Sequence, residues 1–378
     1  MSVTTETREG RSYTFRRYER GDERGFLDLF ETTWGERRGE EWFRWRFVDN
    51  PYLDHVPMFV AETDGRVVGV RPYFAFRMRV AGEPALALST VDTMVHPDHR
   101  GRGLFTTMTR QSLDFYADED VAFVFNQPNA ASRPGFESLG FRRVDPTTTY
   151  HRVQRPGVFL AERVDGRGTE TLARGADLLA AGYHRLTAGA TWDTEDVAVT
   201  RTPGVATRDL VRLSERATFP GITADRDAAF YEWRFASPAW RRSTYVASAD
   251  GDALAAVIAR TRTTEEGVTV TQIADVAPTT GCDDWRRGVA ACTERVIADA
   301  THADVVSAAA RSFPAEVAAS YGFRRDDRLP LSAGATADGV LCVLPLGDGE
   351  TPPSWTLHGV SLCDPRNWLL SFAEQDTA

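Results

Sequence analysis

The sequence predicts an α+β protein that contains two copies of one fold, arranged one after the other along the chain. Residues 43–47 (FRWRF) return as residues 231–235 (YEWRF). Residues 138–143 (SLGFRR) return as residues 320–325 (SYGFRR). Between these segments each half also has an Asp-Gly pair that separates two apolar runs. Three matches in the same order indicate a duplicated unit.

The length fits two such units, because 378 residues exceed one ordinary domain of about 150 residues. We expect a first domain at residues 1–152 and a helical linker at 153–194, with an Ala/Leu-rich stretch around residues 172–184. A second domain then covers residues 195–346. A tail at residues 347–378 ends in an apolar Trp-Leu-Leu run, which we expect to pack onto one of the domains.

Apolar spacing predicts the order β-α-α-β-β-β-α-β-α-β in each copy. Asp64-Gly65 is a hairpin signal between the first two long strands. Gly140 is expected to terminate a helix at its C-terminal end. In the first copy the strands are expected at residues 13–17, 58–62, 66–79, 85–95 and 121–125, and the helices at 21–34, 40–47, 103–116 and 129–139.

Composition excludes several classes of function. A net charge of −10 argues against nucleic acid as a partner, because phosphate binding needs a basic surface. The same acidic surface favours cationic substrates such as amines. None of the 44 basic residues is lysine, and this Arg-only, carboxylate-rich composition predicts a halophilic (salt-adapted) source, with codon bias as the alternative explanation.

The four cysteines lie in the last hundred residues without metal-ligand spacing, so neither a metal site nor a disulfide framework is expected. The sequence has neither an N-terminal apolar segment typical of a signal peptide nor an apolar run near 18 residues. We therefore expect a cytoplasmic protein that does not interact with a membrane.

The stretch at residues 95–104 (VHPDHRGRGL) carries the clearest chemical signal. A strand ends at Pro97, Gly101 and Gly103 alternate with arginines, and a helix follows at once. Glycines let a backbone approach a ligand, and a helix start offers unpaired N–H groups to phosphate. The pattern predicts a diphosphate cradle. A dinucleotide fold or a P-loop fits less well, because no GxGxxG follows the first strand and no lysine is present.

Residues 100–105 (RGRGLF), following a V-x-P strand end, resemble the acyl-CoA signature of GNAT acetyltransferases. Residues 136–141 (FESLGF) are similar to the closing motif of the same family. The resemblance implies two tandem GNAT folds, each a mostly antiparallel twisted sheet with a splayed strand pair, flanked by helices. It also implies acetyl-CoA or another acyl-CoA as the cofactor. The cofactor-binding residues would be Met94, Val95, Arg100, Gly101, Arg102, Gly103, Leu104, Phe105, Asn126 and Asn129.

Some positions depart from the family pattern or allow a second interpretation. Phe105 replaces the last small residue of the signature. Phe136 occupies the place where many members have a tyrosine acid, and it cannot donate a proton. The side chains of Asn126 and Asn129 could bind the pantetheine or simply form a turn. Trp45, with its repeat in the second copy, is expected to be a core residue rather than a substrate contact.

Attack on a thioester needs a neutral amine, so a base must accept a proton. Asp92 is the first candidate, although an aspartate in a strand can be purely structural. If that strand is regular, Asp92, Met94 and His96 share one face. His96 is the second candidate, with a plain surface role as the alternative, and Glu62 is the third.

The second copy lacks the signature. At residues 276–285 (VAPTTGCDDW) the paired glycines and arginines are gone, and two aspartates lie where a diphosphate would bind. We expect this copy to be degenerate and non-binding. The leading hypothesis is an N-acetyltransferase that acylates an amine of a small molecule or a protein. The alternatives are a non-catalytic acyl-CoA-binding module and a Fem-type aminoacyltransferase.

Overall fold

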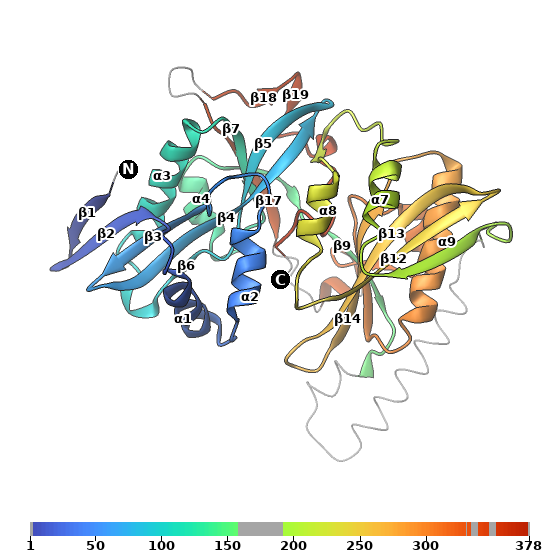
Figure 1. Ribbon diagram of the computed structural model, residues 1–378, viewed down its shortest axis with the longest axis horizontal. Helices are drawn as coiled ribbons and strands as arrows, with labels where there is room; N and C mark the ends of the chain where they lie inside the picture. The colour runs from blue at the N-terminus through green and yellow to red at the C-terminus, as the bar shows by residue number, and fades with distance from the viewer. Residues whose placement is uncertain (1–2, 158–191, 330, 334–338, 348–352, 377–378) are drawn as a thin grey trace, which may run out of the picture.

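The computed structural model describes residues 3–157, 192–329, 331–333, 339–347 and 353–376. Two sheets, each covered by helices, lie beside each other, one built mainly from each half of the chain (Figure 1). This arrangement confirms the predicted α+β fold with two tandem copies. The helix expected around residues 172–184 lies outside the described residues.

The first sheet has the strand order β1-β2-β3-β4-β5-β7-β17-β8, and two short strands, β6 and β11, also pair with β4. Its pairs are antiparallel except for β5 and β7, which run parallel. The strands are β1 (Thr4–Arg8), β2 (Arg11–Arg17), β3 (Met58–Thr63), β4 (Arg66–Val80), β5 (Glu83–Thr90), β6 (Met94–Val95), β7 (Val121–Asn126), β8 (Arg142–Pro146), β11 (Ile222–Ala224) and β17 (Val340–Pro345).

The second sheet has the order β10-β12-β13-β14-β15-β9-β16 and repeats the design of the first. Here β14 and β15 are the parallel pair. The strands are β9 (Thr149–Val153), β10 (Ala198–Pro203), β12 (Arg241–Ala249), β13 (Asp252–Thr263), β14 (Thr269–Ala277), β15 (Val305–Ala309) and β16 (Arg324–Arg325).

The two copies exchange strands. After β8 the chain leaves the first sheet, and β9 pairs with β15 and β16 of the second sheet. In return β17, late in the chain, lies between β7 and β8 of the first sheet. Each sheet is therefore completed by the other half of the chain, which ties the two copies together.

Helices cover the outer faces of the sheets and fill the space between them (Figure 1). In each copy the long helix that follows the third long strand packs on one face of that copy's sheet. The helices are α1 (Glu23–Trp34), α2 (Glu40–Phe43) with the π-helical turn η1 (Arg44–Val48), η2 (Pro97–His99), α3 (Leu104–Ala117), α4 (Arg133–Ser138), α7 (Thr207–Ser214), α8 (Ala228–Arg234), α9 (Asp283–Asp299), α10 (Ala315–Ser320), η3 (Leu331–Ala333) and η4 (Pro365–Asn367).

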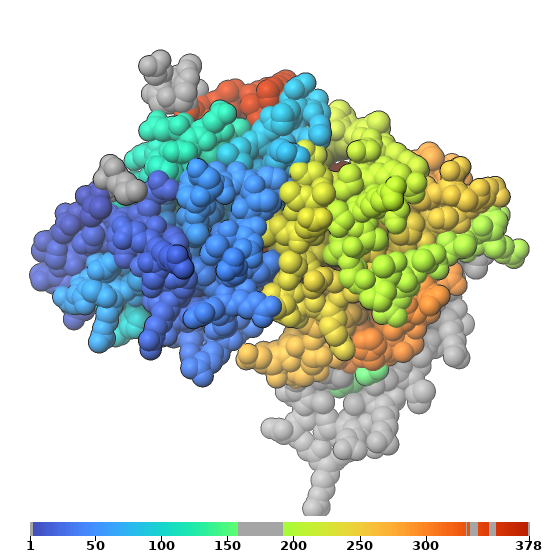
Figure 2. Space-filling model, in the orientation of Figure 1, coloured from blue at the N-terminus to red at the C-terminus, as the bar shows by residue number. Residues whose placement is uncertain are grey.

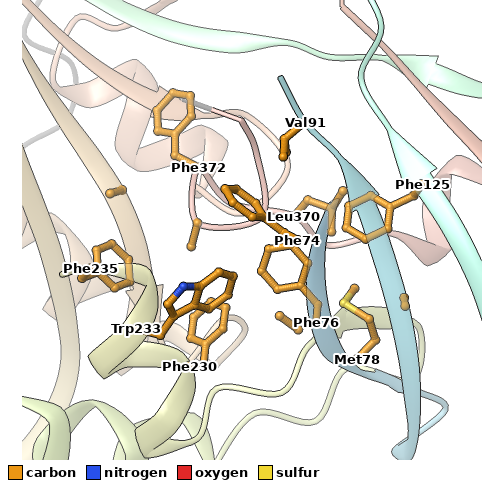
Figure 3. Packing of buried hydrophobic residues seen from close by; sticks show 14 of the residues in the cluster. Phe74, Phe76, Met78, Val91, Phe125, Phe230, Trp233, Phe235, Leu370 and Phe372 are labelled. Atoms are coloured by element: carbon orange, nitrogen blue, oxygen red, sulfur yellow. The ribbon is translucent and has the colours of Figure 1, made fainter. Parts of the chain in front are cut away.

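One hydrophobic core runs through the junction of the copies. It contains residues of α1, α2, β4 and β7 from the first copy and residues of α8, β13 and β14 from the second. The C-terminal tail joins it, because Leu370 and Phe372 lie close to Phe74 and Trp233 (Figure 3). In the space-filling view the two copies meet along a continuous seam (Figure 2). A short hairpin, β18 (Thr356–Leu357) and β19 (Val360–Ser361), precedes this tail.

Trp45 and Trp233 mark the local symmetry of this junction. The indole N–H of Trp45 donates to the carbonyl of Trp233 at 2.8 Å, and that of Trp233 donates to the carbonyl of Trp45 at 3.0 Å. Both side chains are buried. The repeated motif is thus a core element, as expected, and it joins the two copies directly.

Two details differ from the sequence prediction. The strand expected at residues 85–95 is interrupted after Thr90 and resumes as β6, with Asp92 at a φ of 41°. Asp tolerates this left-handed conformation better than most residues. The interruption breaks the alternation that was expected to place Asp92, Met94 and His96 on one face. The helix expected from residue 129 begins only at Arg133, because Asn129 forms a turn.

Among the described residues, no helix combines the length and apolar character needed to span a membrane.

Candidate active site

A pocket of about 370 Å³ lies where two strands of the first sheet diverge. β5 and β7 pair in parallel up to Ser89 and Phe125 and then separate. On one side of the gap the backbone bulges at residues 91–93, and on the other the chain turns at residues 126–129. The splayed strand pair implied by the sequence resemblance is therefore present, and it opens a cavity at the centre of the first copy.

Asp92 lies in this pocket and forms an ion pair with Arg46, which is fully buried. Arg46 also pairs with Asp376, near the C-terminus. Burial raises the pKa of Asp92 to about 6, because loss of hydration disfavours the carboxylate more than Arg46 favours it. Asp376 adds to the rise. A carboxylate with such a pKa can accept a proton near neutral pH.

The C-terminal tail supplies one wall of the pocket. Glu374 and Asp376 both line it. Glu374 is buried and ion-pairs with Arg226 of the second copy at 2.9 Å, and Arg226 also pairs with Asp275. Arg234 of the second copy donates to the tail carbonyls of residues 373 and 375. Sequence reasoning missed these contacts, because nothing in the sequence connects the two ends of the chain.

Asn126 is buried in the pocket wall, and neither its amide nitrogen nor its amide oxygen has a hydrogen-bond partner among the described residues. Leaving a buried polar group unpaired costs about 1–3 kcal/mol, so such groups are uncommon in native proteins. Asn129 differs: its side-chain oxygen accepts hydrogen bonds from the amides of Ala131 and Ser132. Of the two asparagines predicted to bind the cofactor, Asn126 has free hydrogen-bonding capacity, and Asn129 shapes a turn at the pocket edge.

Next to the pocket, the predicted cradle has the expected backbone form. Gly101 and Gly103 have φ values of 75° and 72°, which non-glycine residues rarely adopt. The amides of residues 101–106 donate to no acceptor in the described part of the chain. These free N–H groups and the positive end of α3 favour an anion. β6, with Met94 buried and Val95 partly exposed, pairs with β4 along one edge, and its other edge faces no described strand.

The arginines of the loop are partly engaged with the protein. Arg100 donates to the carbonyl of Val95 at 3.1 Å. Arg102 pairs with Glu9 at 2.7 Å and donates to the hydroxyl of Tyr13. Arg8, from the first strand, donates to the carbonyl of Arg102 and brings another cation to the cradle. Nothing in the sequence pattern predicts this contribution from Arg8.

Helices α3 and α4 meet beside the pocket. Leu104 is buried in the first turn of α3. The ring of Phe105 packs edge-on against Phe136 of α4, with a centroid distance of 5.3 Å, and both rings line the pocket. Phe105, which replaces the small last residue of the GNAT signature, is thus accommodated because its ring packs against α4.

The two other base candidates are not among the residues that line the pocket. Glu62, in β3, accepts hydrogen bonds from Arg16, which also pairs with Asp22. His96 precedes η2, and its Nδ1 accepts from the amide of Asp98 at 3.3 Å. The pocket therefore brings together Asp92, Asn126 and Phe105 of the predicted cradle, and its lining includes neither His96 nor Glu62.

The second copy has a different loop at the corresponding place. The indole of Trp285 folds back and donates to the carbonyl of Pro278 at 2.9 Å. A side chain at Gly281 would meet Trp285 at 2.5 Å, so this ring fills the space above the loop. Asp283 and Asp284 carry negative charge at the start of α9. A diphosphate would meet both an aromatic ring and like charges here.

Comparisons with known proteins place these observations in a family. Residues 14–144 match the family model described as acetyltransferase (GNAT) domain, and this segment contains the pocket's bulge, the cradle and Asn126. No curated protein sequence matches the chain.

Solved structures resemble the chain over most of its length. A tandem GNAT protein from the clavulanic acid biosynthesis pathway is 16% identical, with a TM-score of 0.51, covering 89% of this chain and 99% of that one. A probable N-acyltransferase from Enterococcus faecalis is 9% identical, with a TM-score of 0.59 and coverages of 89% and 73%. A GCN5-related N-acetyltransferase from Anabaena variabilis is 10% identical, with a TM-score of 0.53 and coverages of 88% and 72%. Residues 14–144 therefore match the GNAT acetyltransferase domain, and the chain as a whole has a tandem GNAT fold.

Proposed function

We propose that the protein is an acyl-CoA-dependent N-acyltransferase with a single active site, located in the first copy. The observation that carries the proposal is Asn126, whose buried amide has no hydrogen-bond partner in the described part of the chain and lines the pocket. One donor and one acceptor side by side match a secondary amide, and the pantetheine arm of CoA contains two such amides.

The residues around the pocket fit the rest of an acyl-CoA. The free amides of residues 101–106 suit its diphosphate, because backbone N–H groups at a helix start bind phosphate oxygens. The edge of β6 that faces no described strand, formed by Met94 and Val95, suits the extended pantetheine arm. The arm would bind to this edge in the way that an additional β-strand would. An amide on this edge can also stabilise negative charge on the thioester oxygen during transfer.

Asp92 is the proposed general base. Asp92 lines the pocket, and its pKa near 6 keeps it ionised at neutral pH while leaving it basic enough to take the proton that the amine nitrogen loses as it attacks the thioester. Arg46 donates a hydrogen bond to this carboxylate and so fixes its position. The proton can then pass to solvent at the open side of the pocket.

The acceptor enters beside the tail. Trp34, at the end of α1, and the carboxylates of Glu374 and Asp376 form this side of the pocket. An aromatic ring and carboxylates together favour a cationic group. The acceptor is therefore an amine of a small molecule or a protein, protonated in solution and deprotonated by Asp92 on binding.

The test compares two buried asparagines. Wild-type protein should bind acetyl-CoA in calorimetry and release free thiol when a panel of amines is added. Asn126→Leu should bind acetyl-CoA about 10- to 100-fold more weakly, the equivalent of one or two lost hydrogen bonds. Its free energy of unfolding should not fall, since the native amide is unsatisfied.

Asn50→Leu is the matched control. Asn50 is also buried, but its side chain bonds to the carbonyl of Ala75 and the amide of Tyr52. This variant should lose stability and keep its affinity for acetyl-CoA. Absence of acetyl-CoA binding by the wild type would refute the proposal. Binding without thiol release across the panel would instead favour a non-catalytic acyl-CoA-binding module.

A further inference from the structure

Arg71, in β4, is a buried cation beside the pocket that has no carboxylate partner in the described part of the chain. The side chain is fully buried. Nε donates to the hydroxyl of Tyr73 at 3.2 Å and Nη1 to the hydroxyl of Thr93 at 2.7 Å. Nη2 is buried and donates to no acceptor among the described residues. A guanidinium stays charged in a protein interior, and an uncompensated buried charge is expensive.

The guanidinium lies directly behind the pocket lining. Its centre is 4.9 Å from the ring centroid of Phe136 and 5.6 Å from that of Phe105. Both rings line the pocket, and so does Thr93. This cation is therefore in contact with three residues that line the pocket: Thr93, which precedes β6, Phe105 of α3 and Phe136 of α4.

Arg46 is a buried arginine of the same molecule whose charge is balanced by carboxylates. It is equally buried, but it bonds to the carboxylates of Asp92 and Asp376. Among the described residues, the contacts of Arg71 are with hydroxyls and aromatic rings. No carboxylate of the described chain therefore compensates this charge beside the pocket.

Acyl transfer from a thioester releases a thiolate anion, which a nearby cation can stabilise. The amine nitrogen forms a bond to the acyl carbon, the carbon–sulfur bond breaks, and its electron pair stays on sulfur. Asp92 takes the proton lost by the nitrogen. Phe105 and Phe136, on the α3 and α4 side of the pocket, have no proton to give to the sulfur. A charged group in a water-poor site is an effective partner for this thiolate.

We propose that the positive charge of Arg71, acting across the rings of Phe105 and Phe136, stabilises the leaving CoA thiolate in place of an acid that would protonate it. This inference rests on the proposed acyl-CoA site. The thiolate persists in the field of the guanidinium until it takes a proton from solvent or from protonated Asp92, which restores the free thiol and the base.

The test measures the ionisation of bound CoA and needs no acceptor amine. CoA is titrated with base in the presence of excess protein, and the ultraviolet absorbance of the thiolate is followed. In the wild type the pKa of the bound thiol should lie at least about one unit below that of free CoA, as for thiols beside arginine. In Arg71→Met the bound thiol should titrate like free CoA.

The control is Arg260→Met, which removes another fully buried arginine, in β13 of the second copy. This variant should leave both CoA affinity and the thiol pKa unchanged. Urea denaturation should show that Arg71→Met is folded, since it removes an uncompensated charge. A wild-type thiol that titrates like free CoA, or an equal pKa in wild type and Arg71→Met, overturns the inference. Failure of the wild type to bind CoA overturns the proposed function itself.

Discussion

The two copies share one fold but differ at the loop before their longest helix. In the first copy Gly101 and Gly103 leave the amides at the start of α3 free and open. In the second copy Trp285 covers the loop, and Asp283 places a negative charge at the start of α9. Strand order and helix positions survived the divergence of the copies, whereas the cradle did not. The ligand chemistry therefore depends on a few loop residues rather than on the fold.

A second difference concerns equivalent arginines of the repeated motif. Arg46 of the first copy holds two carboxylates at the pocket. Arg234 of the second copy holds carbonyls of the C-terminal tail, and burial together with Arg46 lowers its pKa to about 10. The second copy has thus lost a cradle but positions the tail that forms a wall of the first copy's pocket. We therefore propose that the second copy gives structural support to the site of the first copy.

The largest effect is expected from Gly103→Glu, which should abolish acetyl-CoA binding. Gly103 has a left-handed φ, and a side chain there would meet the guanidinium of Arg8 at 2.4 Å. A carboxylate would also repel the diphosphate. Calorimetry measures the loss. Cys282→Glu, at the equivalent N-cap of α9, is exposed and should bind as tightly as the wild type. Equal binding by both variants would show that the cradle is not the site.

Asp92→Asn should lower kcat at least about 100-fold while acetyl-CoA affinity is retained, because the amide cannot accept the amine proton. The raised pKa of Asp92 sets the pH dependence: the group is protonated and inactive below about pH 6 and ionised above it. The wild-type rate should therefore rise with pH through about 6. A rate that is flat across this range in the wild type, or an active Asp92→Asn variant, would remove Asp92 as the base.

Asp376→Asn should raise KM for amines by about 10-fold, the effect of weakening one charge-assisted contact. Affinity for acetyl-CoA should not change, since the residue lies on the acceptor side of the pocket. Steady-state kinetics with a cationic amine measure the difference. An unchanged KM would mean that the tail closes the pocket without contacting the acceptor.

The smallest effect is expected at the symmetric tryptophans. Trp45→Phe and Trp233→Phe each remove one indole N–H that donates to the other residue's carbonyl. Each should lower the free energy of unfolding by about 1 kcal/mol, and by similar amounts in the two variants. Urea denaturation checks both. A large difference between them would show that the two halves of the junction are not equivalent.

Much of the fold could be predicted from the sequence, because local signals agreed with one another. The repeat around Trp45 indicated the duplication, and Asp64-Gly65 indicated the hairpin of β3 and β4, where both residues have positive φ. The strand exchange could not be predicted. The apolar run of β17 reads as a strand, but nothing in it specifies pairing with β7 rather than with β15.

The backbone form of the cradle was also predictable, since its residues are contiguous in sequence. The acceptor side was not, because it brings together residues from opposite ends of the chain. Arg46 and Asp376 are 330 positions apart. Arg71 reads as an ordinary exposed residue in a strand, and only its packing under Phe136 makes it a buried cation.

The central claim is that one of the two copies binds acyl-CoA, and the stoichiometry of binding tests it most directly. Titration of the wild-type chain with acetyl-CoA in a calorimeter should give one site per chain, and the Gly103→Glu variant should give none. Two sites per chain, or one site that survives in Gly103→Glu, would contradict the account, because binding would then involve the second copy.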